Sequence, residues 1–175
     1  MTALDAINSR TSYRGRYANT AVPREHLIKI IEAGLAAPSG CNKQTTSLIA
    51  VDDADVLRKF REVITSHTDT AQAVICVLTQ KLIAYADRCF SVQDYSAAIQ
   101  NMLLAIVELG YQSCWVEGEI TGEGAIGRKM ADILGVPEDY DLVCFLPVGI
   151  AEQPTKRPDK KPFGERAWFN GFKKA

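Results

Sequence analysis

The chain has 175 residues, of which 47% are hydrophobic and 23% are charged. These fractions are typical of a globular domain with a sizeable core, and they argue against an intrinsically disordered chain. The formal net charge of −1 argues against general electrostatic attraction to nucleic acid, so we expect no nucleic-acid partner.

The first half of the chain alternates between helical and strand patterns. Asp5–Arg10 is expected to form a short helix. Pro23–Ala37 carries an apolar stripe at helical spacing, and prolines at its start and just after its end set the limits of a predicted helix. Two strands are predicted at Ser47–Val51 and Ala73–Thr79, with an amphipathic helix between them at Ala54–Ile64.

The second half opens with the strongest helical pattern, at Asp94–Leu109, where apolar residues recur at helical spacing. Its alanines predict close packing on another helix. A short strand is expected at Ser113–Val116, a helix at Gly124–Leu134 and a strand at Leu142–Ile150. Because helices and strands mix without strict βαβ alternation, we predict the α+β class.

The tail from Ala151 changes in character. It is rich in lysine and proline, and it then carries four large aromatic residues, Phe163, Trp168, Phe169 and Phe172. Exposing such side chains to water is costly. We therefore expect them to pack, either on this subunit or on a partner.

The cysteines and the N-terminus bear on location and on metal binding. Five cysteines are spread without a CxxC pair, which argues against a structural metal and favours a reducing cytoplasm. Cys76, Cys114 and Cys144 lie in apolar stretches and are expected in the core. Met1–Arg10 lacks the apolar segment of a secretory signal, and runs such as Ala73–Leu78 are far shorter than the roughly 20 residues that span a bilayer. We expect no membrane association.

Four segments carry the residue types of a ligand site. Arg10–Arg14 places two guanidinium groups around hydroxyl residues, a planar and charged grip for a phosphate. Pro38–Gln44 is dense in small and amide residues that can bond a flat heterocycle. Gly110–Gly118 is expected to contain a strand that ends in Glu117-Gly118 with free backbone N–H groups. Pro154–Lys161 is basic. Taken singly, each has a plain alternative: a solvated basic turn, a connecting loop, a core tryptophan and a solvated tail.

In this order, the four segments resemble the nitroreductase family over essentially the whole chain. The first resembles the family's Arg-Arg-Ser-x-Arg motif, with Thr11 in place of an arginine. The second resembles Ala-Pro-Ser-x-x-Asn-x-Gln-Pro-Trp, except that Thr45 and Thr46 replace the last two residues. Glu117-Gly118 resembles the family's turn at the flavin edge, and Lys160-Lys161-Pro162 resembles its late basic motif.

The resemblance implies a fold and an assembly. Residues 1–175 would form a single FMN-binding domain, a three-layer α-β-α sandwich with a central, mostly antiparallel sheet. Two chains would form an intertwined homodimer with two FMN molecules in the interface. Interface contacts are expected from the Ala97–Leu109 helix and the aromatic tail.

The resemblance also implies the cofactor site. Arg10, Ser12 and Arg14 would hold the phosphate and nearby polar atoms of the flavin, Asn42 would bond the ring, and the backbone N–H of Glu117 would face N5. The loop at Pro38–Gly40 is a candidate contribution from the other subunit. The expected cofactor-binding residues are Arg10, Thr11, Ser12, Arg14, Pro38, Ser39, Gly40, Asn42, Gln44, Trp115, Val116, Glu117, Gly118, Arg157 and Lys160.

The activity expected from this resemblance is transfer of a hydride from NADH or NADPH through FMN to a small organic acceptor, such as a nitroaromatic or a quinone, by a ping-pong mechanism. No side chain is needed as nucleophile or metal ligand, because the flavin carries the hydride. Two alternatives remain open. One is another flavin reaction, such as dehydrogenation, dehalogenation or flavin breakdown. The other is a non-catalytic protein that sequesters or senses flavin.

Overall fold

A computed structural model describes residues 1–64 and 66–172. Its centre is an antiparallel sheet of three strands in the order β1-β2-β5, formed by β1 (Thr46–Val51), β2 (Ala73–Thr79) and β5 (Asp141–Val148). Every residue of the central strand β2 is buried. The strand is rich in β-branched and aliphatic residues because helices cover both faces of the sheet.

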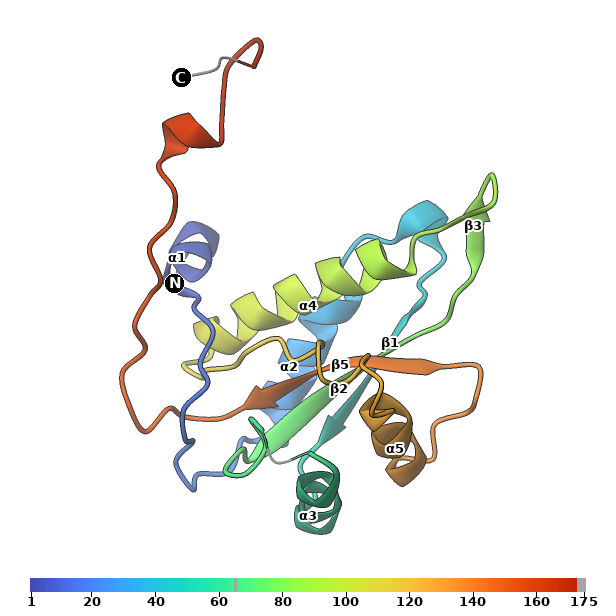
Figure 1. Ribbon diagram of the computed structural model, residues 1–175. Coiled ribbons are helices and arrows are strands. Elements are labelled where there is room, and N and C mark those ends of the chain that lie inside the picture. Colours follow the sequence, from blue (N-terminus) through green and yellow to red (C-terminus); the bar gives the residue numbers. More distant parts are fainter. Residues whose placement is uncertain (65, 173–175) are drawn as a thin grey trace.

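Two pairs of helices enclose the sheet, as Figure 1 shows. The helices α2 (Arg24–Leu35) and α4 (Ser91–Glu108) cover one face, and α3 (Ala54–Val63) and α5 (Ile126–Ile133) cover the other. Alternate residues of β2 enter two separate hydrophobic cores, with Ile75 and Val77 facing α2 and α4. The prediction of an α+β chain with a three-layer sandwich and an antiparallel sheet is therefore confirmed.

The longest helix, α4, packs closely against α2, as its alanines predicted. At Gly34 of α2 the contact leaves no room for a methyl group, since a Cβ there would lie 2.8 Å from Cγ of Met102. Asn101 adds a hydrogen bond to the carbonyl of Ala33, 3.1 Å long. The short helix α1 (Ala3–Ser9) lies beside the C-terminal end of α4. There the N-terminal ammonium of Met1 forms an ion pair with Glu108 at 3.2 Å.

Two local predictions need correction. Ser113–Val116 is not a regular strand, because Ser113 bridges to Ser12 while Val116 bridges to Phe145, so no continuous ladder can form. The helix α5 begins at Ile126 rather than Gly124, since Ala125 has a left-handed φ of 50°.

The structure also contains a hairpin that the sequence did not lead us to expect, formed by β3 (Ile83–Tyr85) and β4 (Arg88–Cys89). Its two turn residues, Ala86 and Asp87, both have positive φ values, 44° and 62°. Turns of this kind usually show Asn-Gly or Asp-Gly, so Ala-Asp gave no signal.

The C-terminal tail leaves the sheet and runs past α1, away from the body of the molecule (Figure 1). It contains one short 3₁₀ turn, η2 (Phe163–Glu165). Phe163, Phe169 and Phe172 are 67%, 77% and 73% exposed, and the tail aromatics contact one another in pairs. Of the two alternatives expected for these side chains, packing on this subunit does not cover the three phenylalanines, which leaves a partner as the alternative.

Two further observations concern the sequence-based expectations. Cys76, Cys114 and Cys144 are buried, as predicted, whereas Cys41 and Cys89 are exposed. Among the helices formed by residues 1–64 and 66–172, none is long and apolar enough to cross a bilayer.

Candidate functional site

The first and fourth motifs come together in one basic pocket. Arg10, Thr11, Ser12 and Arg14 follow α1, and the tail crosses them, so that the two segments line a cavity of about 390 Å³. The tail contributes Lys156, Arg157, Pro158 and Lys160. Five cations therefore surround this cavity, and no acidic residue lines it within the described part of the chain. None of the five forms an ion pair with another described residue. Such a set of free cations is suited to a phosphate.

The third motif starts beside this pocket. The N–H of Tyr13 donates to the carbonyl of Ser113 at 2.9 Å, which aligns Arg10–Arg14 with the segment that leads to Glu117. Val116 exchanges two backbone hydrogen bonds with Phe145, of 3.1 and 3.0 Å, and its side chain is buried in the core. Any contact of Val116 with a ligand must therefore come from its backbone.

Beyond Val116 the backbone turns. The carbonyl of Glu117 accepts the N–H groups of Ile120 and Thr121, at 2.8 and 3.0 Å. The N–H groups of Glu117 and Gly118 donate to no acceptor in residues 1–64 and 66–172. A Cβ placed on Gly118 would meet nothing within 4 Å. The turn thus offers two free donors next to open space.

The side chain of Glu117 is fixed from two directions. Its carboxylate accepts the indole N–H of Trp115 at 2.7 Å and the hydroxyl of Tyr95 at 3.1 Å. Burial, together with the Glu117 carboxylate, raises the pKa of Tyr95 to about 12, so the hydroxyl stays protonated and donating. Trp115 and Tyr95 therefore hold the turn, although Tyr95 was not among the predicted residues.

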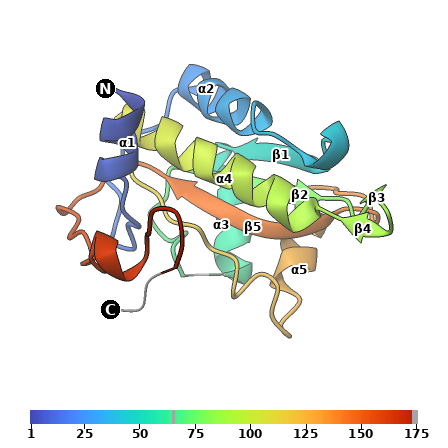
Figure 2. The same ribbon diagram turned by 90° about the horizontal axis from the view of Figure 1, so that it is seen from above.

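The second motif lies elsewhere in this chain. Pro38, Ser39 and Gln44 border a separate cavity of about 180 Å³, and the 3₁₀ turn η1 (Gly40–Asn42) lies within this loop. Figure 2 shows this turn at one end of α4 and α1 at the other. The loop contacts Asp94 near the start of α4, while Met1, just before α1, pairs with Glu108 at the end of α4, about 21 Å along the helix at 1.5 Å per residue. The loop and the N-terminal segment therefore lie at opposite ends of α4, whereas the Glu117 turn reaches Tyr95, the residue after Asp94.

Asp94 and Thr45 are two polar residues near the loop that sequence reasoning did not assign to the site. Asp94 is 4% exposed and accepts hydrogen bonds from the N–H of Gly40 and the hydroxyl of Thr45, both 2.7 Å long. Thr45 stands where the family motif has proline. An acidic residue within the apolar face of a helix was the signal that could have pointed to Asp94.

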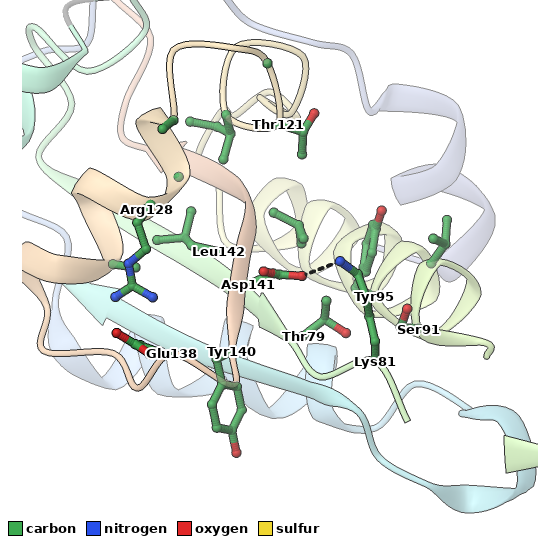
Figure 3. Close-up of a pocket in the computed structure, with 17 residues that line it drawn as sticks. Thr79, Lys81, Ser91, Tyr95, Thr121, Arg128, Glu138, Tyr140, Asp141 and Leu142 are labelled. Carbon is green, nitrogen blue, oxygen red and sulfur yellow. Dashed lines mark ion pairs between the residues drawn. The ribbon is translucent and has the colours of Figure 1, made fainter. Parts of the chain in front are cut away.

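Tyr95 also lines a larger cavity, of about 650 Å³, which lies between the start of α4 and α5 (Figure 3). Its two cations are already paired within the chain. Lys81 forms an ion pair with Asp141 at 2.7 Å, drawn as a dashed line, and Arg128 forms one with Asp132 at 2.7 Å. This cavity therefore offers no free cation, in contrast to the basic pocket.

No group of three or more His, Cys, Asp or Glu side chains among the described residues is arranged to hold a metal ion. The candidate chemistry of the site consists instead of free cations at one end and free backbone donors at the turn.

Comparison with known proteins supplies the family. The model of the nitroreductase family matches residues 7–78 and 64–150. The chain belongs to the nitroreductase family. The expected membership in this family is thereby confirmed.

The relatives of this nitroreductase-family chain span nearly its whole length. A protein of Archaeoglobus fulgidus, provisionally named NADH dehydrogenase/NAD(P)H nitroreductase, is 31% identical over 164 residues, which cover 93% of this chain and 89% of the relative. A crystal structure of a BluB-like flavoprotein from Clostridium difficile superposes with a TM-score of 0.82 at 26% identity, covering 98% of this chain and 100% of that one. An FMN-dependent nitroreductase from Clostridium difficile gives a TM-score of 0.81 at 25% identity, covering 97% and 99%.

Proposed function

We propose that the protein is a homodimeric, FMN-dependent oxidoreductase that uses NADH or NADPH to reduce a small organic acceptor, such as a nitroaromatic or a quinone. The observation that carries this proposal is the basic pocket with its five cations, none of which pairs with another residue in 1–64 or 66–172. The pocket opens next to the segment that ends in the free N–H groups of Glu117 and Gly118. A phosphate joined to a flat heterocycle matches both features.

The residues present fit FMN. Arg10 and Arg14 would bind the phosphate through their guanidinium groups, with the Ser12 hydroxyl between them and Arg157 and Lys160 closing the pocket from the tail. The N–H of Glu117 would donate to N5 of the ring, and that of Gly118 would lie near the adjacent carbonyl. When bound, FMN supplies two-electron chemistry at N5, accepting a hydride from NADH or NADPH and passing it to the acceptor.

The protein's own part is binding and orientation. Backbone donors at the turn and cations at the pocket are already in place before the ligand arrives, so they favour negative charge on the ring without reorganising. The carboxylate of Glu117, fixed by Trp115 and Tyr95, prevents the turn from rotating its N–H groups away. None of the residues in these segments needs to act as a nucleophile or as a metal ligand, because the flavin carries the hydride.

The position of the Pro38–Gln44 loop supports a dimer. Because this loop lies at the far end of α4 from α1, we propose that it meets the FMN held by the partner, where Asn42 would bond the ring. The three exposed phenylalanines of the tail support the same arrangement, since a partner would remove them from water. In this proposal residues 1–175 act as one FMN-binding domain in the cytoplasm.

The cofactor is tested first, by the visible spectrum of the purified protein and by chromatography of the molecule released on heating. FMN in near-equal amount to protein is expected. Oxidation of NADH or NADPH with a quinone or nitroaromatic is then followed by absorbance. A protein that binds FMN yet oxidises neither donor would be a sequestering or sensing protein, and a protein that binds no FMN would contradict the whole proposal.

The kinetic order is tested separately. A hydride donor must come within roughly 3–3.5 Å of N5, and an acceptor needs the same approach. If one face of the ring is open, the two cannot be bound there together, so ping-pong kinetics are expected. Initial rates against NADH at several fixed quinone concentrations should give parallel double-reciprocal lines. Intersecting lines would indicate a ternary complex and rule out a single shared pocket.

A further inference from the structure

The Pro38–Gln44 loop has an unusual backbone. Cys41, Asn42 and Gln44 all have left-handed φ values, of 50°, 53° and 50°. Residues other than glycine disfavour this region because the Cβ crowds the backbone, and they keep such values only where neighbouring groups enforce them. Three of them within four residues require an explanation from the surrounding structure.

Hydrogen bonds inside the loop explain its shape but not its position. The N–H of Asn42 donates to the carbonyl of Ser39, that of Lys43 to the carbonyl of Gly40, and that of Gln44 to the hydroxyl of Ser39, with distances of 3.0, 3.1 and 3.0 Å. These bonds all join residues of the loop itself. They would survive if the loop moved as a unit.

Asp94 ties the loop to α4, in addition to the bond by which the N–H of Gln80 donates to the carbonyl of Thr45 at 3.1 Å. One carboxylate oxygen accepts the N–H of Gly40, and the other accepts the hydroxyl of Thr45, so the side chain binds both ends of the strained segment to α4. Gly40 can approach because it lacks a side chain, since a Cβ there would lie 2.5 Å from Cδ2 of Phe90. Thr45 is 3% exposed, so its hydroxyl has no access to water as a substitute partner.

Among the described residues, the Asp94 carboxylate accepts hydrogen bonds only from Gly40 and Thr45. Asp94 forms no ion pair with a described residue, although burying a carboxylate is costly unless it is well bonded. Its position in the first turn of α4 adds a favourable helix dipole. Two charge-assisted hydrogen bonds and this dipole offset the free-energy cost of burying the carboxylate. Both hydrogen bonds come from the loop and from the residue that follows it, Thr45.

We propose that Asp94 and Thr45 form a positioning pair, which holds the strained Pro38–Gln44 loop in the conformation that meets the flavin. This inference rests on the proposed function. Neither residue touches the cofactor. They act through Gly40 and the left-handed residues that follow it. Where the family motif has proline, this chain has a hydroxyl donor, so the loop is held by a side chain that proline could not supply.

The chain offers a matched pair of variants. Thr45→Val removes the hydroxyl that donates to Asp94 while keeping the β-branched shape. Thr46→Val makes the same change at the next residue, whose hydroxyl is buried without a hydrogen-bond partner among the described residues. Thr45→Ser restores the donor. Asp94→Asn keeps one acceptor and serves as an independent second variant.

Two readouts separate positioning from folding. In the apoprotein, amide hydrogen exchange of Gly40–Gln44 should become about tenfold faster in Thr45→Val and should be unchanged in Thr46→Val and Thr45→Ser, because one charge-assisted hydrogen bond is lost only in the first. The Kd for FMN should rise by about tenfold in Thr45→Val and Asp94→Asn, and by less than about twofold in Thr46→Val. The thermal midpoint of the apoprotein should fall by several degrees in Thr45→Val, because a buried bond to Asp94 is lost, and by less in Thr46→Val and Thr45→Ser; unfolding should remain cooperative in all three.

The outcomes are distinguishable. Unchanged exchange in Thr45→Val would overturn the pair, whether or not the protein binds FMN. Faster exchange with wild-type FMN affinity would show a held loop that does not position the flavin, which also overturns the inference. Accelerated exchange throughout the protein would indicate a merely structural role. Wild-type protein that binds no FMN would contradict the proposed function alone, because the exchange experiment needs no ligand.

Discussion

The basic pocket allows a quantitative test by removal of single cations. Arg10 is half-buried and Arg14 is exposed, and both line the cavity. A hydrogen bond to a charged group contributes about 1.5–3 kcal/mol. Loss of one such bond therefore raises the Kd for FMN by about tenfold to one hundredfold. Arg10→Ala should lie at the upper end of this range, and Arg14→Ala at the lower end, because solvent screens the exposed side chain.

Fluorescence titration of the apoprotein with FMN measures these affinities. Lys81→Ala is the matched control, because it removes the same charge from a lysine that is paired with Asp141 in a different cavity. The Kd of this variant for FMN should stay within about twofold of the wild-type value, because Lys81 does not line the basic pocket. Its exposed ion pair contributes only about 0–1 kcal/mol to stability, so the fold should be little affected. The affinity should also weaken with added salt in wild type, and less steeply in Arg10→Ala.

Two results would refute this reasoning. Wild-type affinity in both arginine variants would show that the phosphate does not occupy the basic pocket. An equal loss in Lys81→Ala would show that the overall charge of the protein matters, rather than the arrangement of Arg10 and Arg14. A repeat with riboflavin, which lacks the phosphate, should abolish the difference between wild type and Arg10→Ala.

The remaining predictions concern the tail and the thiols. Truncation before Trp168 should convert the proposed dimer to a monomer in light scattering, because the aromatic pair of Trp168 and Phe172, with ring centroids 4.1 Å apart, would be lost from the proposed interface; a truncated chain that stays dimeric would place the interface elsewhere. Ellman's reagent at pH 8 should modify two of the five cysteines in the native protein, the exposed Cys41 and Cys89, and all five after unfolding. The buried thiols should stay unreactive because burial raises the pKa of Cys114 to about 11 and also raises the pKa of Cys76 and of Cys144, which keeps them protonated; rapid reaction of a third thiol would contradict this. Cys41→Ser should keep most of the oxidoreductase activity, and loss of NADH oxidation with FMN still bound would instead give Cys41 a redox role.

The sequence predicts those parts of the fold that depend on periodic burial. The β-branched run of β2 and the apolar stripe of α4 are local patterns, and both elements form close to where they were expected. The β3–β4 hairpin escaped prediction because its turn residues, Ala86 and Asp87, adopt positive φ without the usual glycine.

The site was accessible from the sequence only in part, for a similar reason. Charged motifs are visible as residue types, so Arg10 and Lys160 could be assigned to a phosphate site in advance, and the structure brings them to one cavity. The hydrogen bond between Thr45 and Asp94 joins residues 49 positions apart. Such a contact depends on how α4 packs against the loop, which no local pattern reveals.

The basic pocket is built partly from a tail that then continues into the aromatic segment, and this shared origin has a thermodynamic consequence. A ligand that orders Lys156–Lys160 also restricts the residues that follow them, so in the proposed dimer occupancy of the pocket and association of two chains would be linked by mass action. Each equilibrium would then shift the other by the same free energy. Dilution would promote loss of FMN, and scarcity of FMN would promote dissociation. Empty protomers with a free tail would then be the copies most open to proteolysis.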